Sequence, residues 1–348
     1  MSELKRFRNP SAYSMTDPHR LSSMANIARR LPRKGLLGVL LALLLLLTSG
    51  CSVRKFAIHK LGDVLAGGTA SVFATDDDPE LIRDALPFAL KTIEALLAES
   101  PEQPKLLLAA CQGFTQYAYA FAEVEAIRLE PTDYRGAVRQ RQRALKLYLR
   151  GRDYCFDAVR MASPGLIEAL RHSPETALAE SDFDDVELMY WTAAAWGSAV
   201  SAGLDRPELV ADAPAIRSLV ERALELDSGY ASGAIHEAMV VLESLPAHMG
   251  GSIERALHHF KRALALSQGK KAGPYVTWAS EVSVKQQDRG EFERCLRKAL
   301  DVDVDALPEE RLANLVAQDL AQILLSQAED LFFEEAGPET DSGTALCK

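Results

Sequence analysis

Strand-like patterns are almost missing from this sequence of 348 residues. Alternation of β-branched and polar residues, which is typical of a half-buried strand, is hard to find. Alanine and leucine, both strong helix formers, dominate every long segment instead. The missing pattern excludes a sheet-based fold and predicts an all-α protein.

Sequence signatures of catalysis are missing as well. The chain has no HExxH zinc motif, no GxxxxGK[ST] phosphate-binding loop and no GxSxG nucleophile elbow. No acid, base and nucleophile can be named as a group. We therefore expect neither an enzyme nor a cofactor.

Cysteine is scarce, with five residues in the chain. An oxidising compartment would permit a disulfide, but the spacing demands none, because no CxxC pair occurs. We expect mostly buried thiols at the four cysteines that follow Cys51: Cys111, Cys155, Cys295 and Cys347.

Histidine offers no pattern of metal ligands. His258 and His259 are adjacent and lie on different sides of a predicted helix, so they cannot share one ion. His236 and His248 are isolated. We expect all four at the surface and no metal site.

Positive charge is also in short supply. The net charge of the chain is −10, and without residues 1–50 there remain 31 basic and 47 acidic residues, a net charge of −16. So acidic a surface repels nucleic acid and anionic headgroups at long range. Binding of nucleic acid is not expected.

Residues 1–50 have the features of a signal peptide. Four basic residues precede the apolar segment Gly35–Leu47. As a helix that segment would extend roughly 20 Å, short of the ~30 Å hydrocarbon core. The region before Met24 is long for a leader, and a start at Met24 would give a more compact one.

Cys51 is the predicted lipidation site. Small residues precede it as in a bacterial lipobox, although Thr48 replaces the usual aliphatic residue, and an ordinary secretory cleavage is the alternative. Ser52 is not the aspartate that commonly retains lipoproteins on the inner membrane. We expect a periplasmic protein held in the inner leaflet of the outer membrane by acyl chains alone.

A helical stripe recurs along the chain and is clearest in residues 252–266, where Ala256, Phe260 and Ala263 follow one another at helical steps. Small residues in such a stripe let a partner backbone approach. Related segments repeat at intervals of 48, 79, 40 and 36 residues, whereas a regular tetratricopeptide array keeps about 34. The pattern predicts one domain over 51–335, an irregular, tetratricopeptide-like superhelix of helical hairpins, followed by a disordered tail at 336–348.

Capping signals predict individual helix starts. Asp78 and Pro79 begin a helix over 80–98, in which Pro87 is expected to produce a kink or a break. The acidic run 181–185 precedes another helix. It lacks the glycine and the final glutamate of a calcium loop, so N-capping explains it better.

The most basic segment after the leader is residues 139–161. It is either a docking face for an acidic partner or the solvated side of a helix, and we favour the solvated side.

Aromatic residues make up 7% of the chain, and three groups of them lie among small residues. In superhelical repeats the first helix of each hairpin usually faces inward, so these groups are candidates for lining an apolar cavity. Packing between helices is the alternative for each. The candidates are Phe114, Tyr117, Tyr190, Trp191, Trp196, Tyr275 and Trp278, with Tyr119 and Phe121 in the same series as Phe114.

Several long segments resemble one known family. They read MGGSIERALHHFKRALALSQGKKAGPYVTWAS, DALPFALKTIEALLAESPEQPKLLLAACQGFTQYAYAF and DDVELMYWTAAAWGSAV, and the likeness extends from about Lys55 to Phe333. In these segments the chain is similar to the T component of tripartite ATP-independent periplasmic (TRAP) transporters.

The resemblance implies a lipid-anchored periplasmic homotrimer that partners the substrate-binding P subunit of the transporter. It also implies a cavity or pore for a small, hydrophobic ligand. The alternative is an outer-membrane scaffold lipoprotein that uses its repeats to assemble other proteins and binds no small molecule.

Overall fold

The computed structural model describes residues 72–333 and 347. Every regular element within them is helical and no strand occurs there, which confirms the all-α prediction. No helix among these residues is long and apolar enough to cross a membrane. The predicted signal peptide (1–50), the lipidation site Cys51 and most of the predicted helical segment 55–75 lie outside the described residues.

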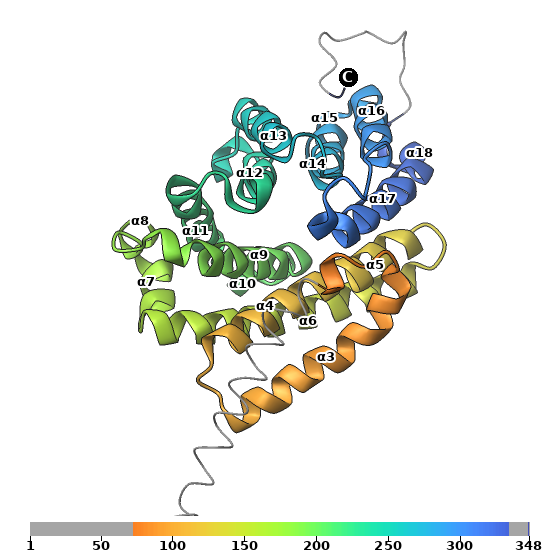
Figure 1. The fold of residues 1–348 in the computed structure, drawn as a ribbon. Helices are drawn as coiled ribbons and strands as arrows, with labels where there is room; N and C mark the ends of the chain where they lie inside the picture. Colours follow the sequence, from red (N-terminus) through yellow and green to blue (C-terminus); the bar gives the residue numbers. More distant parts are fainter. Residues whose placement is uncertain (1–71, 334–346, 348) are drawn as a thin grey trace, which may run out of the picture. The chain divides into compact units, whose positions relative to one another are not determined.

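The longer helices follow one another with short connections (Figure 1). They are α3 (Pro79–Glu99), α4 (Pro104–Ala118), α6 (Tyr134–Ala162), α9 (Val186–Ala202), α11 (Ala213–Leu226), α12 (Tyr230–Glu243), α13 (Ile253–Ser267), α16 (Arg289–Leu300) and α17 (Arg311–Ser326). The shorter ones are α5 (Val124–Leu129), α7 (Leu166–His172), α8 (Pro174–Ala177), α10 (Pro207–Val210), α14 (Gly273–Trp278), α15 (Val284–Gln286) and α18 (Ala328–Leu331).

Two of the remaining turns are π-helical, η1 (Tyr119–Glu123) and η4 (Ala279–Ser283). Each lies inside a continuous helical stretch, η1 between α4 and α5 and η4 between α14 and α15. The other turns are 3₁₀-helical: η2 (Phe183–Asp185), η3 (Ala247–Met249) and η5 (Pro308–Glu310).

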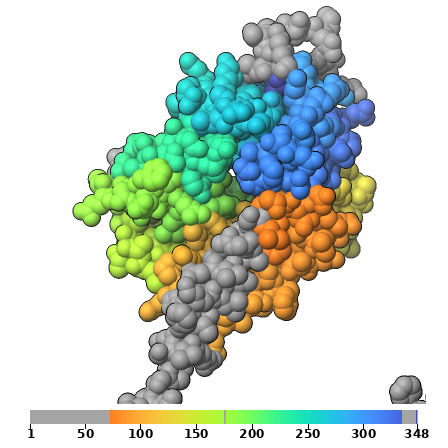
Figure 2. All heavy atoms as spheres, viewed as in Figure 1, coloured from red at the N-terminus to blue at the C-terminus, as the bar shows by residue number. Residues whose placement is uncertain are grey.

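Consecutive helices pack on one another through most of this unit. α4 packs on α6, α6 on α9, α9 on α11, α12 on α13, and α16 on α17. The helix α17 also contacts α3 and α5, so the last long helix returns to the first part of the unit. Figure 1 shows the resulting ring of helices, and Figure 2 shows the orange residues of α3 beside the blue C-terminal helices.

The stripe predicted in residues 252–266 is the buried face of α13. Its members Ala256, Phe260 and Ala263 are all buried. At Ala263 the helix α12 comes close, because a Cβ added to Gly233 would lie 3.1 Å from the Ala263 Cα. At this position the structure confirms that an alanine of the stripe admits a neighbouring backbone.

Side-chain caps confirm the two predicted helix starts. The Asp78 carboxylate accepts hydrogen bonds from the amides of Glu80 and Leu81, both at 3.0 Å, at the start of α3. Asp182 and Asp185 form a reciprocal capping box immediately before α9, which accounts for the acidic run without a calcium ion. α3 runs through Pro87 as one helix, so the segment is not broken there.

The four cysteines among the described residues are paired, so the expectation of buried thiols is wrong. Cys111 of α4 bonds to Cys155 of α6, with their Cα atoms 5.3 Å apart, and Cys295 of α16 bonds to Cys347, at 5.1 Å. Partners 44 and 52 residues apart in sequence meet only because the fold brings them together. Cys347 is buried, so this residue of the predicted disordered tail is fixed, and the rest of 336–348 lies outside the described residues.

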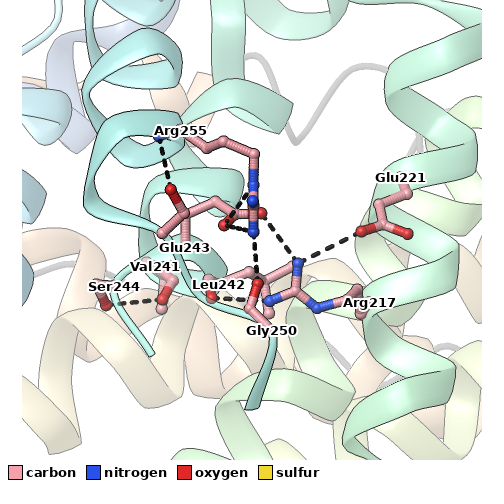
Figure 3. A network of polar contacts seen from close by, with 9 residues as sticks. Arg217, Glu221, Val241, Leu242, Glu243, Ser244, Gly250 and Arg255 are labelled. Atoms are coloured by element: carbon pink, nitrogen blue, oxygen red, sulfur yellow. Dashed lines mark hydrogen bonds and ion pairs between the residues drawn. The ribbon is translucent and has the colours of Figure 1, made fainter. Parts of the chain in front are cut away.

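Glu243, at the end of α12, joins three helices (Figure 3). Its side chain is 2% exposed and accepts hydrogen bonds from Arg217 Nη1 of α11 (3.0 Å) and Arg255 Nε of α13 (2.9 Å). The same guanidinium groups donate to the carbonyls of Leu242 and Gly250. A buried carboxylate with two guanidinium partners is satisfied, so this group fixes the position of α12.

The basic segment 139–161 lies on α6, and several of its charges are matched within the chain. Ion pairs join Arg141 to Glu130, Arg150 to Glu94 and Arg160 to Asp157. These pairs support the interpretation of the segment as a solvated helix face.

Candidate functional site

A cavity of about 840 Å³ lies among α3, α4, α9, α11, α12, α14 and α17. Its lining is mostly apolar, with Leu86, Leu90 and Ile93 of α3 on one wall. Small residues, Gly113 of α4 and Gly197 of α9 among them, leave space on the facing helices. The volume falls within the roughly 300–1,000 Å³ that is usual for small-molecule sites.

Four of the predicted aromatic residues line this cavity: Tyr190 and Trp191, and also Tyr119 and Phe121. Tyr190 and Trp191 of α9 meet edge to face, with their ring centroids 5.3 Å apart. Tyr230, at the start of α12, packs against Tyr190 at 5.2 Å and extends the same wall. The aromatic pattern does not predict Tyr230, because this residue stands alone in the sequence rather than in an aromatic group.

Trp196 does not line the cavity, contrary to expectation. It is completely buried, packs edge to face on Phe156 at 4.7 Å, and donates a hydrogen bond to Asp212 (3.0 Å). Residues five apart on a helix point about 140° away from each other, so Trp191 and Trp196 cannot share one face. α9 is packed on both sides, and only one of them faces the cavity.

Phe114 and Tyr117 of α4 also belong to the packing between helices. Phe114 stacks on Tyr154 at 5.9 Å, and the hydroxyl of Tyr117 accepts a hydrogen bond from Arg143 (3.1 Å). Both rings are buried.

The π turn η1 begins immediately after α4 and changes the helical register. Within this turn, Tyr119 and Phe121 line the cavity. The pattern of small and aromatic residues in the sequence does not reveal a π turn.

Tyr275 and Trp278 of α14 are the last two predicted residues that do not line the cavity. Trp278 is buried and stacks on Phe260 at 4.8 Å, and Tyr275 meets the same ring at 6.1 Å. α14 instead presents Thr277 to the cavity. Neighbouring residues on a helix point about 100° apart, so Thr277 and Trp278 lie on different faces of α14.

Glu237 of α12 is the carboxylate that bonds to Thr277. The Thr277 hydroxyl donates to Glu237 Oε1 at 2.9 Å, and both residues line the cavity. Burial raises the pKa of the Glu237 carboxyl, while the ammonium of Lys271 and the bond from Thr277 oppose that rise. Gly273 makes room for the group, because a Cβ there would lie 2.7 Å from Glu237 Oε1.

Lys271, the basic residue of the lining, is already engaged. Its Nζ lies 3.1 Å from Glu310 Oε1 and donates to the carbonyl of Ala231 at 3.2 Å. Ala231 has a left-handed backbone conformation, φ 44°, which is unfavourable for an alanine. The bond from Lys271 helps to hold this strained start of α12 at the edge of the cavity.

Negative charge prevails around the lining. Burial raises the pKa of Tyr119, and the carboxylates of Glu123, Glu237 and Glu281 raise it further. Burial and the Glu237 carboxylate likewise raise the pKa of Tyr190. The described lining residues include one cation, Lys271, and four carboxyl groups, those of Glu187, Glu237, Glu309 and Glu310.

Two of the histidines expected at the surface are buried. His236 of α12 and His259 of α13 place their Nδ1 atoms 2.8 Å apart between the two helices. Burial, with the nearby charges of His259, Arg262 and His258, lowers the pKa of His236 to about 4. The expectation of surface histidines is wrong here, since it considered each helix alone, whereas His258 and His248 are exposed as predicted.

A possible set of metal ligands in the described ranges consists of Glu291, Cys295 and Cys347, whose ligand atoms lie within 4.8 Å of one another. Both sulfur atoms form the Cys295–Cys347 disulfide, and Glu291 accepts a hydrogen bond from the Cys347 amide at 3.0 Å. The disulfide accounts for this cluster without a metal.

Comparison with known proteins identifies the family. A family model described as TRAP transporter T-component matches residues 75–332. The chain belongs to the TRAP transporter T-component family. This confirms the resemblance seen in the sequence.

A Treponema pallidum protein described as uncharacterized is similar to this T component. The two are 26% identical over 310 residues, which are 83% of this chain and 95% of the relative.

The part of this T component that matches the family contains nearly all of the cavity. Tyr190, Trp191, Tyr230, Glu237 and Thr277 all fall within residues 75–332. The family is one of transporter components rather than of enzymes, and membership links the protein to TRAP transport. The cavity is therefore the candidate functional site.

Proposed function

We propose that this protein is a lipid-anchored accessory component of a TRAP transporter that binds a small, hydrophobic ligand in its cavity and docks the P subunit. The observation that carries the ligand-binding part is the cavity of about 840 Å³ with its aromatic wall. An apolar cavity with a few polar groups is the usual form of a small-molecule site. Docking of the P subunit rests on family membership.

Native mass spectrometry of the full-length protein tests ligand binding. We expect a bound small molecule in the wild type and a loss of retention in Trp191→Ala, which removes part of the aromatic wall. Phe183→Ala, an exposed ring outside the cavity lining, is the matched control and should retain the ligand. Absence of any ligand, together with stable association with the P subunit, would favour the scaffold function instead.

Copurification tests docking. The P subunit of the same transporter, carrying an affinity tag, should retain this protein at physiological salt. A substrate-binding protein from an unrelated transporter is the control and should not. Equal retention by both, or by neither, would contradict a specific partnership.

We propose that Cys51 is acylated and that the protein lies in the periplasm, in the inner leaflet of the outer membrane. Two disulfides among the described residues support an oxidising compartment. Mass spectrometry should find acyl chains on Cys51, and Cys51→Ser should release the protein from membranes. A wild-type protein that fractionates without membranes would refute the anchor.

We also propose that the protein is a homotrimer, as the family resemblance implies. Sedimentation of the full-length protein in uncharged detergent should give three copies per particle. A monomeric mass under the same conditions would reject this assignment.

We infer that the neighbouring helix pairs are degenerate repeats of a tetratricopeptide type. The small residues that the sequence pattern selects in α11, α13 and α16, namely Ala223, Ala263 and Ala299, are all buried. A crystal structure in which these alanines lay away from helix contacts would refute the inference.

A further inference from the structure

The polar part of the cavity wall has a carboxyl group, that of Glu237, which forms no ion pair among the described residues. Glu237 receives a hydrogen bond from Thr277 at 2.9 Å, whereas the nearest lining cation, Lys271, is bound to Glu310 and to a backbone carbonyl. Two further carboxylates, those of Glu123 and Glu281, add negative charge near this part of the wall, because together with Glu237 they raise the pKa of the lining residue Tyr119.

The wall next to this carboxyl group is aromatic. Tyr190 is close enough to Glu237 for the carboxylate to raise its pKa, and Tyr190 contacts both Trp191 and Tyr230. Aromatic faces attract cations, most strongly where water is excluded. The carboxylate and the aromatic rings thus both favour a cationic group on the ligand.

The same lining disfavours an anionic ligand group. Lys271, the one cation among the described lining residues, already has Glu310 and the Ala231 carbonyl as partners. Like charges repel more strongly in a partly buried site than in water, because the effective dielectric constant is lower. A carboxylate or phosphate group would have no free cation among the described lining residues.

We propose that the cavity binds a hydrophobic amine, a molecule with an apolar body and one protonated nitrogen that donates a hydrogen bond to Glu237. This inference rests on the proposed ligand-binding function and specifies the chemical class of the ligand. The raised pKa of Glu237 agrees with it, since a carboxyl group that burial disfavours as an anion is stabilised by a cation beside it.

Three probes of nearly equal size and different charge test the proposal: 4-phenylbutylamine, 4-phenylbutanol and 4-phenylbutanoate. Their affinities are measured by calorimetry on the full-length protein in nanodiscs of uncharged lipid, with empty nanodiscs as the blank. We expect the amine to bind about tenfold more tightly than the alcohol, as for a charge-assisted hydrogen bond. The carboxylate should bind most weakly.

Glu237→Gln should reduce the preference for the amine over the alcohol to about one, while the affinity for the alcohol stays the same. Glu225→Gln makes the same change on an exposed part of α11 outside the cavity and should keep the preference. Thr277→Val removes the hydrogen bond to Glu237 but leaves the carboxylate, so it should also keep the preference. If Glu237→Gln fails to fold, the comparison of the three probes on the wild type still tests the ligand class.

The outcomes separate the two levels of the proposal. Equal binding of amine and alcohol, tighter binding of the carboxylate, or an amine preference that survives in Glu237→Gln would overturn the ligand class and leave a ligand-binding cavity standing. Failure of all three probes to bind, together with an absence of retained ligand in native mass spectrometry, would overturn both.

Discussion

His236 and His259 face each other through their Nδ1 atoms at 2.8 Å, in the contact between α12 and α13. At that distance one Nδ1 donates the hydrogen bond and the other accepts it, so the pair cannot be protonated on both rings and keep the bond. Because Glu237 follows His236 on α12, the same helix carries this pair on one side and the cavity carboxylate on another.

The histidine pair should make stability depend on pH. The pKa of His236 is lowered to about 4 in the folded protein, so between pH 6.5 and about pH 4 the unfolded chain binds a proton that the folded protein rejects. The stabilisation present above pH 6.5 is therefore lost as the pH falls through this window. Charged groups around the pair, His258, Arg255 and Arg262 on α13, add to the cost of protonation, while Glu243 opposes it for His259.

Thermal melting followed by circular dichroism measures this effect. We expect the melting temperature to fall less from pH 7 to pH 4.5 in His236→Gln than in the wild type. The exposed His248→Gln is the control and should match the wild type. An identical pH dependence in all three proteins would contradict a contribution from the pair.

The Cys111–Cys155 disulfide should stabilise the fold, because it closes a long loop between α4 and α6. Replacing both cysteines by serine should lower the free energy of unfolding by about 2–4 kcal/mol, mainly because the unfolded chain gains freedom. Urea unfolding measures the change. The fully oxidised wild type is the control, and an unchanged midpoint in the double variant would contradict the disulfide.

Glu243 should contribute far more to the stability of the fold than an exposed glutamate of the same network. Glu243→Ala leaves Arg217 without its buried partner and should lower the free energy of unfolding by about 3–5 kcal/mol. Glu221→Ala removes the half-exposed partner of the same guanidinium and should cost less than about 1 kcal/mol. Equal losses in chemical denaturation would show that burial does not set the difference.

Trp191 and Trp196, on one helix, should separate ligand binding from stability. Trp196→Ala removes a completely buried ring and should lower the free energy of unfolding by about 3–5 kcal/mol. Trp191→Ala should cost clearly less, because that ring is half-buried at the cavity, yet only this variant should lose the ligand while still folded. Urea unfolding and native mass spectrometry on both variants check this. Loss of the ligand in a folded Trp196→Ala but not in Trp191→Ala would contradict a cavity on the Trp191 face of α9.

Local interactions explain which parts of the fold could be predicted. A cap such as Asp78 or Asp182 bonds to amides two or three residues away, so its signal is complete within a short segment. The buried stripe of α13 repeats every three or four residues for the same reason. The site was predicted less well. Tyr119, Phe121, Tyr190 and Trp191 line the cavity, whereas the other five candidates pack between helices, because a helix such as α9 has neighbours on more than one side.

The sequence by itself determined the helical class, the family, the helix starts and the small residues that let helices approach, because these depend on neighbours along the chain. Only the tertiary structure decided that Cys111 meets Cys155, that His236 meets His259, and that Tyr230 and Glu237 share a cavity with Trp191. Each of these meetings depends on how a whole helix is turned about its axis. That turn is set by the sum of contacts from all the surrounding helices.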